Sequence, residues 1–437
     1  MSAGICILNK NAIAMAADSA VTIGHHAAIH NSANKLFSLS RYEPVGVIIY
    51  ASASFMEVPM EIIIKQYKAT LGNQSFPSLE EYVDDFIAFM ENNCELFHFD
   101  NNEETYVTNL YTDLLAGLHN GYKRLIEIEV QKVQRQLKDD ELKKIAQQAF
   151  DETIEYISGQ ETISGANFSQ YITNTYLNKI NAFVSAEFKW LSADQIKELC
   201  SKLCTLYDTK FFRNGYVGIA IAGYGKKDIF PKMSHILLGG IINGKTRYIL
   251  REKLIISENN NAAIAPLAQT DVMQTFLFGI NDSFIQDMAN EIPKQINNCI
   301  ATASDELFAE GKKAEVQNLL LGTTPKIIQQ IGQNANNRYM NPIINSVATL
   351  PIEELALLAE SMINITSLRR KVALDGNIGT VGGPIDVAII TKGDGLIWMK
   401  RKHYFDLKYN PQYIYTHYNH STNNCPEELL YENTETE

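Results

Sequence analysis

The sequence predicts an α+β fold in which blocks of strands alternate with blocks of helices. Apolar runs open the chain, strand-like runs return at residues 215–257, and two further strands follow residue 382. The two intervening stretches have apolar residues at helical spacing. This order is typical of a layered architecture in which two antiparallel sheets pack face to face between helical layers.

The first strands are predicted at the N-terminus. Residues 3–8 and 12–17 are apolar runs separated by Asn9-Lys10-Asn11, a pattern typical of a β-hairpin covered on both faces. A third strand is expected at residues 45–53. Because chain ends usually stay solvated unless something holds them, the apolar first strand indicates that the position of residue 2 matters to the fold.

The first helical stretch begins at Ser78, which has capping-box spacing to Glu81. Apolar residues then keep helical spacing, with a second capping box expected at Ser192 and Gln195. No strand pattern interrupts this stretch. We therefore expect a large helical insertion at residues 100–212.

Strand character returns after this insertion. Residues 215–225 form one apolar run, and residues 234–250 form a hairpin that turns at Asn243-Gly244, the dipeptide typical of a type I′ turn. The last strands are expected at residues 382–392 and 395–402, joined through Gly393-Asp394-Gly395.

A second helical region separates these two groups of strands. It spans residues 271–371, and we expect its part at 290–345 to be a second helical insertion. The two insertions belong to one domain that spans residues 1–437. Residues 421–437 are acidic and are expected to form a loosely ordered tail.

The composition excludes several classes of function. The formal net charge is −12 and no run rich in lysine or arginine occurs, which argues against nucleic-acid binding. Six cysteines in 437 residues are too sparse for a disulfide scaffold, so a reducing cytoplasm is expected. The apolar stretches are shorter than a membrane span, and the N-terminus lacks the basic start of a signal peptide. We expect a cytoplasmic protein without a membrane partner.

The N-terminus could carry chemistry if Met1 is removed. Ser2 would then hold a hydroxyl and an α-amine on adjacent atoms. An α-amine has a pKa of about 7.7 to 8.0, near the pH at which a general base is most effective. A cation beside the amine would lower its pKa, and a carboxylate would hold that cation in a dry pocket. Asp18 and Lys35 are the candidates for this pair.

Each of these residues also has an ordinary structural explanation. A serine after the first methionine is common, and an aspartate at a strand end usually forms a turn. A lysine before an apolar pair usually lies in solvent. Only the combination of Ser2, Asp18 and Lys35 points to chemistry.

The segments "MAADSAVTIG", "KLF" and "YASAS" resemble the proteasome β-subunit family of N-terminal nucleophile (Ntn) hydrolases and its bacterial relatives. The resemblance implies the four-layer αββα sandwich of the Ntn hydrolase fold. It also implies that Ser2 is the nucleophile and that Asp18 and Lys35 support it. Ala51 replaces the family glycine whose backbone N–H forms the oxyanion hole.

The resemblance implies further site residues. A substrate would add as a β-strand along the backbone of Thr22, Ser52 and Ala53. A second set would support the site, namely Thr270, Asp375, Gly382 and Gly383. The family's supporting aspartate and serine fall on Ile378 and Val381, so this set differs from the usual one.

The implied function is a peptidase with a polypeptide substrate and no cofactor or metal. The family works inside closed homo-oligomeric rings that an ATPase unfoldase feeds, so self-assembly and such a partner are expected. Two alternatives stay open: an Ntn amidohydrolase acting on a small amide, and a non-catalytic structural homologue.

Overall fold

The computed structural model describes most of the chain. The described residues are 2–23, 28–30, 32–97, 101–212, 215–304, 307–309, 312–372, 381–403, 405–410 and 412. The acidic tail predicted at 421–437 lies outside them. Among the described helices, none has the length and apolar character needed to cross a membrane.

One five-stranded sheet begins at the N-terminus. Its antiparallel strands follow the order β12 (Ala262–Ala268), β1 (Ala3–Asn9), β2 (Ile13–Ala17), β13 (Asp386–Thr391) and β14 (Gly395–Lys400). The predicted N-terminal hairpin is confirmed, since β1 pairs with β2 and both strands are fully buried. The first and last parts of the chain therefore meet in one sheet.

The second sheet also has five antiparallel strands. Their order is β11 (Lys245–Ile255), β10 (Lys232–Ile242), β9 (Val217–Gly223), β6 (Val45–Ala51) and β5 (Leu36–Ser38). Asn243 and Gly244 have φ of 50° and 70°, as the predicted type I′ turn requires. Two small hairpins accompany the sheets, β3 (Val21–Ile23) with β4 (Ala28–His30), and β7 (Ser54–Phe55) with β8 (Val58–Pro59).

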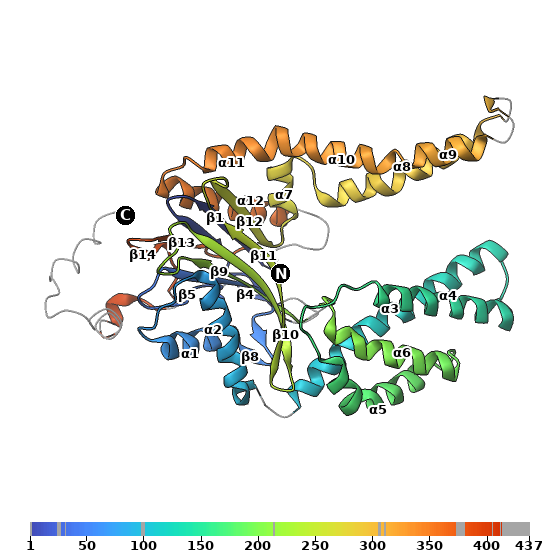
Figure 1. Ribbon diagram of the computed structural model, residues 1–437, viewed down its shortest axis with the longest axis horizontal. Helices are drawn as coiled ribbons and strands as arrows, with labels where there is room; N and C mark the ends of the chain where they lie inside the picture. The colour runs from blue at the N-terminus through green and yellow to red at the C-terminus, as the bar shows by residue number, and fades with distance from the viewer. Residues whose placement is uncertain are drawn as a thin grey trace.

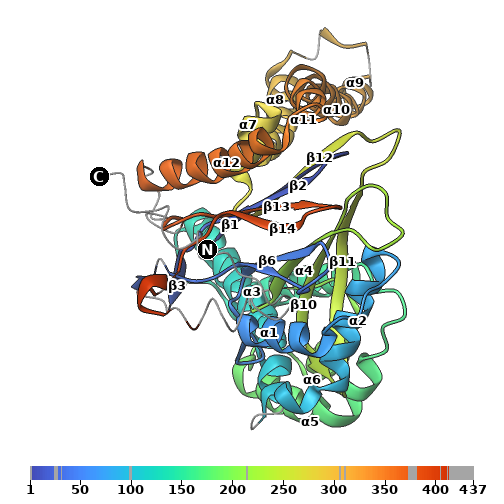
Figure 2. The ribbon, with the colours of Figure 1, turned by 90° about the vertical axis from the view of Figure 1, so that its left-hand side faces the viewer.

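The two sheets pack face to face between helices, as Figure 2 shows. The core between them joins Leu8 and Met15 of the first sheet to Ile48 and Ala220 of the second. Helices α1 (Met60–Leu71) and α2 (Leu79–Asn92) cover the outer face of the second sheet. The first sheet is covered by α7 (Asp271–Phe278), α11 (Asn341–Val347) and α12 (Ile352–Val372). The predicted α+β class is thus what the structure contains.

A helical block with its own core follows α2. It consists of α3 (Asn102–Val133), α4 (Asp139–Ser158), α5 (Ser169–Glu187) and α6 (Ala193–Thr205). Figure 1 shows it extending away from the sheets. Arg247 of β11 is fully buried at the junction, where its guanidinium donates to carbonyls at the end of the block. This side chain therefore holds the block against the second sheet.

A second group of helices extends from the other sheet (Figure 1). It contains α8 (Asp282–Thr302), α9 (Lys313–Leu321) and α10 (Thr324–Ala335), followed by a short π-helix, η4 (Asn336–Met340). Helix α9 buries no residue. These helices therefore add length to the molecule but little core.

One of the two predicted capping boxes is wrong. Ser78 does precede α2, but its Oγ donates to the Glu81 carboxylate at 3.1 Å instead of accepting a backbone N–H. The Leu79 amide is bound by the carboxylate of Asp228, at 2.9 Å. A distant side chain has taken the capping role. The box at the start of α6 is confirmed.

Candidate active site

Asp18 lies immediately after β2 and is buried at the end of the first sheet. Its Oδ1 accepts hydrogen bonds from the Ala3 amide at 2.9 Å and from the Lys35 ammonium at 2.6 Å. Its Oδ2 accepts from the amides of Ala20 at 3.2 Å and Gly382 at 3.1 Å. All four partners are donors, and each carboxylate oxygen accepts two hydrogen bonds.

Ser2 is held beside the Asp18 carboxylate by two backbone hydrogen bonds. The following amide, that of Ala3, is bound to Asp18. The Ser2 carbonyl accepts from the Gln269 amide at 3.1 Å, which continues the pairing of β1 with β12. Ser2 is 6% exposed. The structure thus brings Ser2, Asp18 and Lys35 together at one end of the first sheet.

Lys35 reaches this carboxylate from the second sheet. It directly precedes β5, and its ammonium also donates to the Ala20 carbonyl at 2.5 Å. Burial lowers the pKa of Lys35, and the negative charge of Asp18 opposes that effect. The nearby Lys402 ammonium lowers the Lys35 pKa further. Lys35 is therefore a buried cation with one anionic partner and one carbonyl partner.

A second buried ion pair lies beside the first, and the sequence analysis missed it. Asp386 is the first residue of β13 and faces Ala17 across the ladder, one residue before Asp18. It accepts from both the backbone N–H and the ammonium of Lys402. One sequence feature could have identified Asp386: it begins the apolar run "DVAII", just as Asp18 directly follows the apolar run "IAMAA".

Ala51 ends β6 with a φ of 66°, in the left-handed region that favours glycine. Two residues earlier, the Ile49 N–H donates to the Lys35 carbonyl at 2.9 Å. Because successive backbone N–H groups point to opposite edges of a strand, the Ala51 N–H points to the same edge as that of Ile49. It therefore lies on the Lys35 side of β6, beyond the point where β5 begins at Leu36.

The residues expected to bind substrate come from two segments of the chain. Thr22 lies in β3, which pairs with β4. Ser52 and Ala53 each have one backbone group that is already hydrogen-bonded within the chain. The Ser52 N–H donates to the Tyr216 carbonyl at 3.2 Å, and the Ala53 carbonyl accepts from the Met60 amide at 2.9 Å.

The supporting residues fall into three groups. Gly382 contacts the site directly, through its amide to Asp18, and Gly383 adopts a φ of 77° in the same turn. Thr270 precedes α7 and directly follows Gln269, the residue bound to the Ser2 carbonyl. Asp375 lies outside the described residues.

Ser19 is a further buried residue that the sequence analysis did not single out. Its N–H donates to the Gly382 carbonyl at 3.1 Å, and its Oγ donates to the Pro384 carbonyl at 2.5 Å. These bonds tie the turn at 382–384 to the end of β2. No short motif distinguishes such a serine from a surface turn serine, because its partners lie more than 360 residues away.

Comparison with known proteins adds little to this geometry. No family model matches the sequence, and no curated protein matches it. A solved structure that the chain resembles is titled "Anbu (Gly-1) mutant from Hyphomicrobium sp. strain MC1". The match covers 97% of this chain and 100% of that chain, with 8% sequence identity and a TM-score of 0.25. At this TM-score the likeness carries no argument about fold or activity.

Proposed function

We propose that this chain is a peptidase of the N-terminal nucleophile type, built on the four-layer Ntn hydrolase fold. Ser2 is its nucleophile once Met1 has been removed. The observation that carries the proposal is the shared oxygen of Asp18, which binds both the amide of residue 3 and the Lys35 ammonium. A nucleophile at residue 2 would thus have a buried cation within its immediate surroundings.

In the proposed reaction, the Ser2 Oγ attacks the carbonyl carbon of a peptide bond while the α-amine of the same residue takes the hydroxyl proton. The C–N bond breaks, the α-amine returns the proton to the leaving amine, and an ester joins Ser2 to the acyl part of the substrate. A water molecule, deprotonated by the same amine, then hydrolyses the ester and regenerates Ser2.

Lys35 supplies the electrostatic part of this mechanism. A nearby ammonium disfavours protonation of the Ser2 amine, so the amine stays a base near neutral pH. Asp18 holds Lys35 in place through a short buried hydrogen bond. The ammonium of Lys402, which is paired with Asp386, is a second positive charge and lies close enough to lower the pKa of Lys35.

Ala51 is the proposed oxyanion donor. Its N–H points to the Lys35 side of β6, which is where the developing negative charge would form. The left-handed backbone at this residue turns the chain away from the site immediately afterwards. Thr22, Ser52 and Ala53 are proposed to pair with an extended substrate, with Ala53 contributing its N–H because its carbonyl is bound to Met60.

The proposal extends to the supporting residues and to assembly. Thr270 and the Gly382-Gly383 turn would hold Ser2 and Asp18 in register. An open peptidase site would endanger other proteins, so we propose that copies of the chain assemble into a closed homo-oligomer. An ATPase unfoldase is the proposed partner that would feed polypeptide into it.

The test combines intact mass with a covalent probe. An epoxyketone reacts with a hydroxyl and a free amine of one residue, so it should label the purified full-length chain only after Met1 is lost. Ser2→Ala should abolish labelling, whereas Ser234→Ala, at another buried serine that lies in β10, should not. Retention of Met1, or equal labelling of Ser2→Ala, would overturn the proposal.

Once epoxyketone labelling of Ser2 has been shown, the class of substrate is tested by measuring which compounds the protein hydrolyses. Cleavage of peptides supports the peptidase. Cleavage of small amides alone would instead identify an amidohydrolase. A chain that retains Met1 and turns over neither would be a structural homologue.

A further inference from the structure

Strand β11 forms an open edge of the second sheet. It spans 11 residues and pairs with β10 on one side, and no strand among the described residues pairs with its other side. The Thr246 N–H points to this open edge, because it donates to the Glu91 carboxylate at 3.0 Å. Backbone groups alternate along a regular strand, so the N–H groups of Tyr248 and Leu250 point to the same edge, and the pairing with β10 shifts register directly after Leu250.

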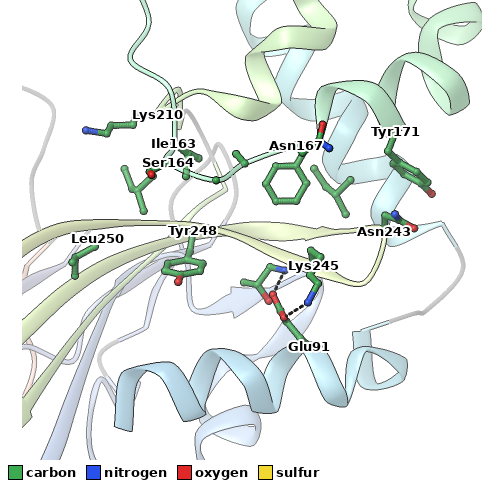
Figure 3. A pocket seen from close by; sticks show the side chains of 16 residues that line it. Glu91, Ile163, Ser164, Asn167, Tyr171, Lys210, Asn243, Lys245, Tyr248 and Leu250 are labelled. Atoms are coloured by element: carbon green, nitrogen blue, oxygen red, sulfur yellow. Dashed lines mark hydrogen bonds and ion pairs between the residues drawn. The ribbon is translucent and has the colours of Figure 1, made fainter. Parts of the chain in front are cut away.

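A cavity of about 580 Å³ lies along this part of the strand. Figure 3 shows Ile163 and Ser164 on one side of β11, and Glu91 of α2 on the other, with Tyr248 and Leu250 pointing toward the α2 side. Glu91 is held in place by Lys245 at 2.9 Å as well as by Thr246. The lining therefore offers apolar surface and an exposed strand edge, and its one carboxylate is already bound.

A second cavity, of about 650 Å³, borders the other half of β11. Glu252 and Leu254 of β11 line it together with α10, η4 and α11. Its lining is rich in carboxamide side chains, namely those of Asn260, Gln333, Asn336, Asn337 and Asn341. A carboxamide both donates and accepts, so it can bind the peptide groups of a chain whatever its sequence.

We propose that β11 binds an extended segment of polypeptide as an added strand, at a site separate from Ser2. Ala3 pairs with Ala268 at one end of β12, whereas the second cavity contacts Ala262 and Ala263 near the other end. The bound segment would be a second contact for the polypeptide substrate, and in that respect the inference rests on the proposed function.

The chemistry of the edge favours this occupant. An unpaired N–H or C=O on a strand edge is satisfied most directly by the backbone of another extended chain. Arg251, Glu252 and Lys253 are exposed on this strand, so two cations flank one carboxylate, in a chain whose net charge is −12. Neutral amides beside a strand with a small excess of positive charge suit a neutral or acidic polypeptide, such as an unfolded protein delivered to a peptidase.

The test measures binding in a chain that cannot react. The full-length Ser2→Ala variant is titrated into fluorescein-labelled α-casein, an unfolded acidic polypeptide, and fluorescence anisotropy is recorded. Leu250→Pro in this background removes one N–H from the open edge and removes no N–H that faces β10. Leu250→Ala is the matched control, because it shortens the same side chain and keeps the N–H.

We expect Leu250→Pro to weaken casein binding about tenfold, since a hydrogen bond is lost and the proline ring obstructs the added strand. Leu250→Ala should weaken it less than about threefold. Hydrogen exchange supplies a readout that needs no proline variant: casein should slow exchange in peptides covering residues 246–254 of the Ser2→Ala chain.

Three results would overturn the inference. The first is equal casein affinity of Leu250→Pro and Leu250→Ala, and the second is absence of protection at residues 246–254. The third is a smaller assembly mass for Leu250→Pro by light scattering, because it would show that β11 joins copies of the chain. Binding in the Ser2→Ala background does not depend on Ser2, so failed epoxyketone labelling would refute the peptidase without deciding whether β11 binds polypeptide.

Discussion

Lys35 donates a hydrogen bond to Asp18 at 2.6 Å, and only 5% and 0% of the two side chains are exposed. The two partners are not equally supported by the rest of the chain. Asp18 has three additional backbone donors. Lys35 has one additional acceptor, the Ala20 carbonyl. Loss of the acid therefore leaves a poorly compensated buried cation, whereas loss of the lysine leaves a carboxylate that still has donors.

This asymmetry predicts unequal effects on stability. Asp18→Asn should lower the free energy of unfolding by about 3 to 5 kcal/mol, as is typical when one partner of a buried pair is removed. Lys35→Met should cost less, and the double variant should be more stable than the sum of the two losses predicts. Urea unfolding of all four proteins measures the coupling. Strictly additive losses would show that the two side chains do not interact.

The sequence predicted the parts of the site that are local in the chain. The hairpin could be recognised because "AGICIL" and "IAMAA" are uniformly apolar and flank a polar turn, so Asp18 could be placed at a strand end. Pairings across long separations could not be seen. Asp228 binds the Leu79 amide from a position 149 residues away, and the Ser78 hydroxyl donates to the Glu81 carboxylate instead of accepting a backbone N–H.

The same limit explains the missed residues. Asp386 faces Ala17 only because β13 inserts between β2 and β14. Lys402 reaches Asp386 from beyond the end of β14. Neither contact follows from a spacing rule, because sheet order is set by packing of the whole chain and not by local pattern.

The left-handed backbone conformation of Ala51 indicates that replacing it with glycine would stabilise the protein. A φ of 66° strains a residue that has a Cβ by roughly 1 to 2 kcal/mol, while glycine loses about 0.5 to 1 kcal/mol of unfolded-state entropy. Ala51→Gly should therefore raise the free energy of unfolding by about 0.5 to 1 kcal/mol. Ala53→Gly is the control, since Ala53 does not have a positive φ, and it should destabilise the protein by a similar amount. Chemical unfolding that ranks the two variants equally would contradict the strain.

His235 predicts a loss of stability in weak acid. It is buried, and its Nε2 is hydrogen-bonded to the Tyr50 hydroxyl. Burial, helped by the Arg251 charge, lowers the pKa of His235 to about 4. The unfolded chain, with a histidine pKa near 6.5, binds more protons between these two values, so the free energy of unfolding falls as pH decreases through that window. The expected contribution is about 2 kcal/mol between pH 7 and pH 5.

The measurement for His235 compares urea unfolding at the two pH values in the wild type and in His235→Gln. Glutamine can still hydrogen-bond to the Tyr50 hydroxyl but has no proton to gain in this range. The variant should therefore lose about 2 kcal/mol less than the wild type on acidification. An identical pH dependence would mean that other groups cause the acid sensitivity.

Arg247 predicts a local weakening of the helical block. Its guanidinium is fully buried, lies over the Phe212 ring at 4.2 Å, and donates to the carbonyls of Tyr207, Thr209 and Phe211. Arg247→Met keeps an apolar stem but leaves these buried acceptors without their donor, at a cost of about 1 to 3 kcal/mol for each group that water cannot reach. Hydrogen exchange should increase at residues 206–212 before it increases in β1 and β2, because the substitution removes the link between the block and the sheet.

The control for Arg247→Met is Arg251→Met, which changes an exposed arginine on the same strand. It should shift the free energy of unfolding by less than about 0.5 kcal/mol. If both variants exchange alike at residues 206–212, the buried guanidinium does not hold the block in place.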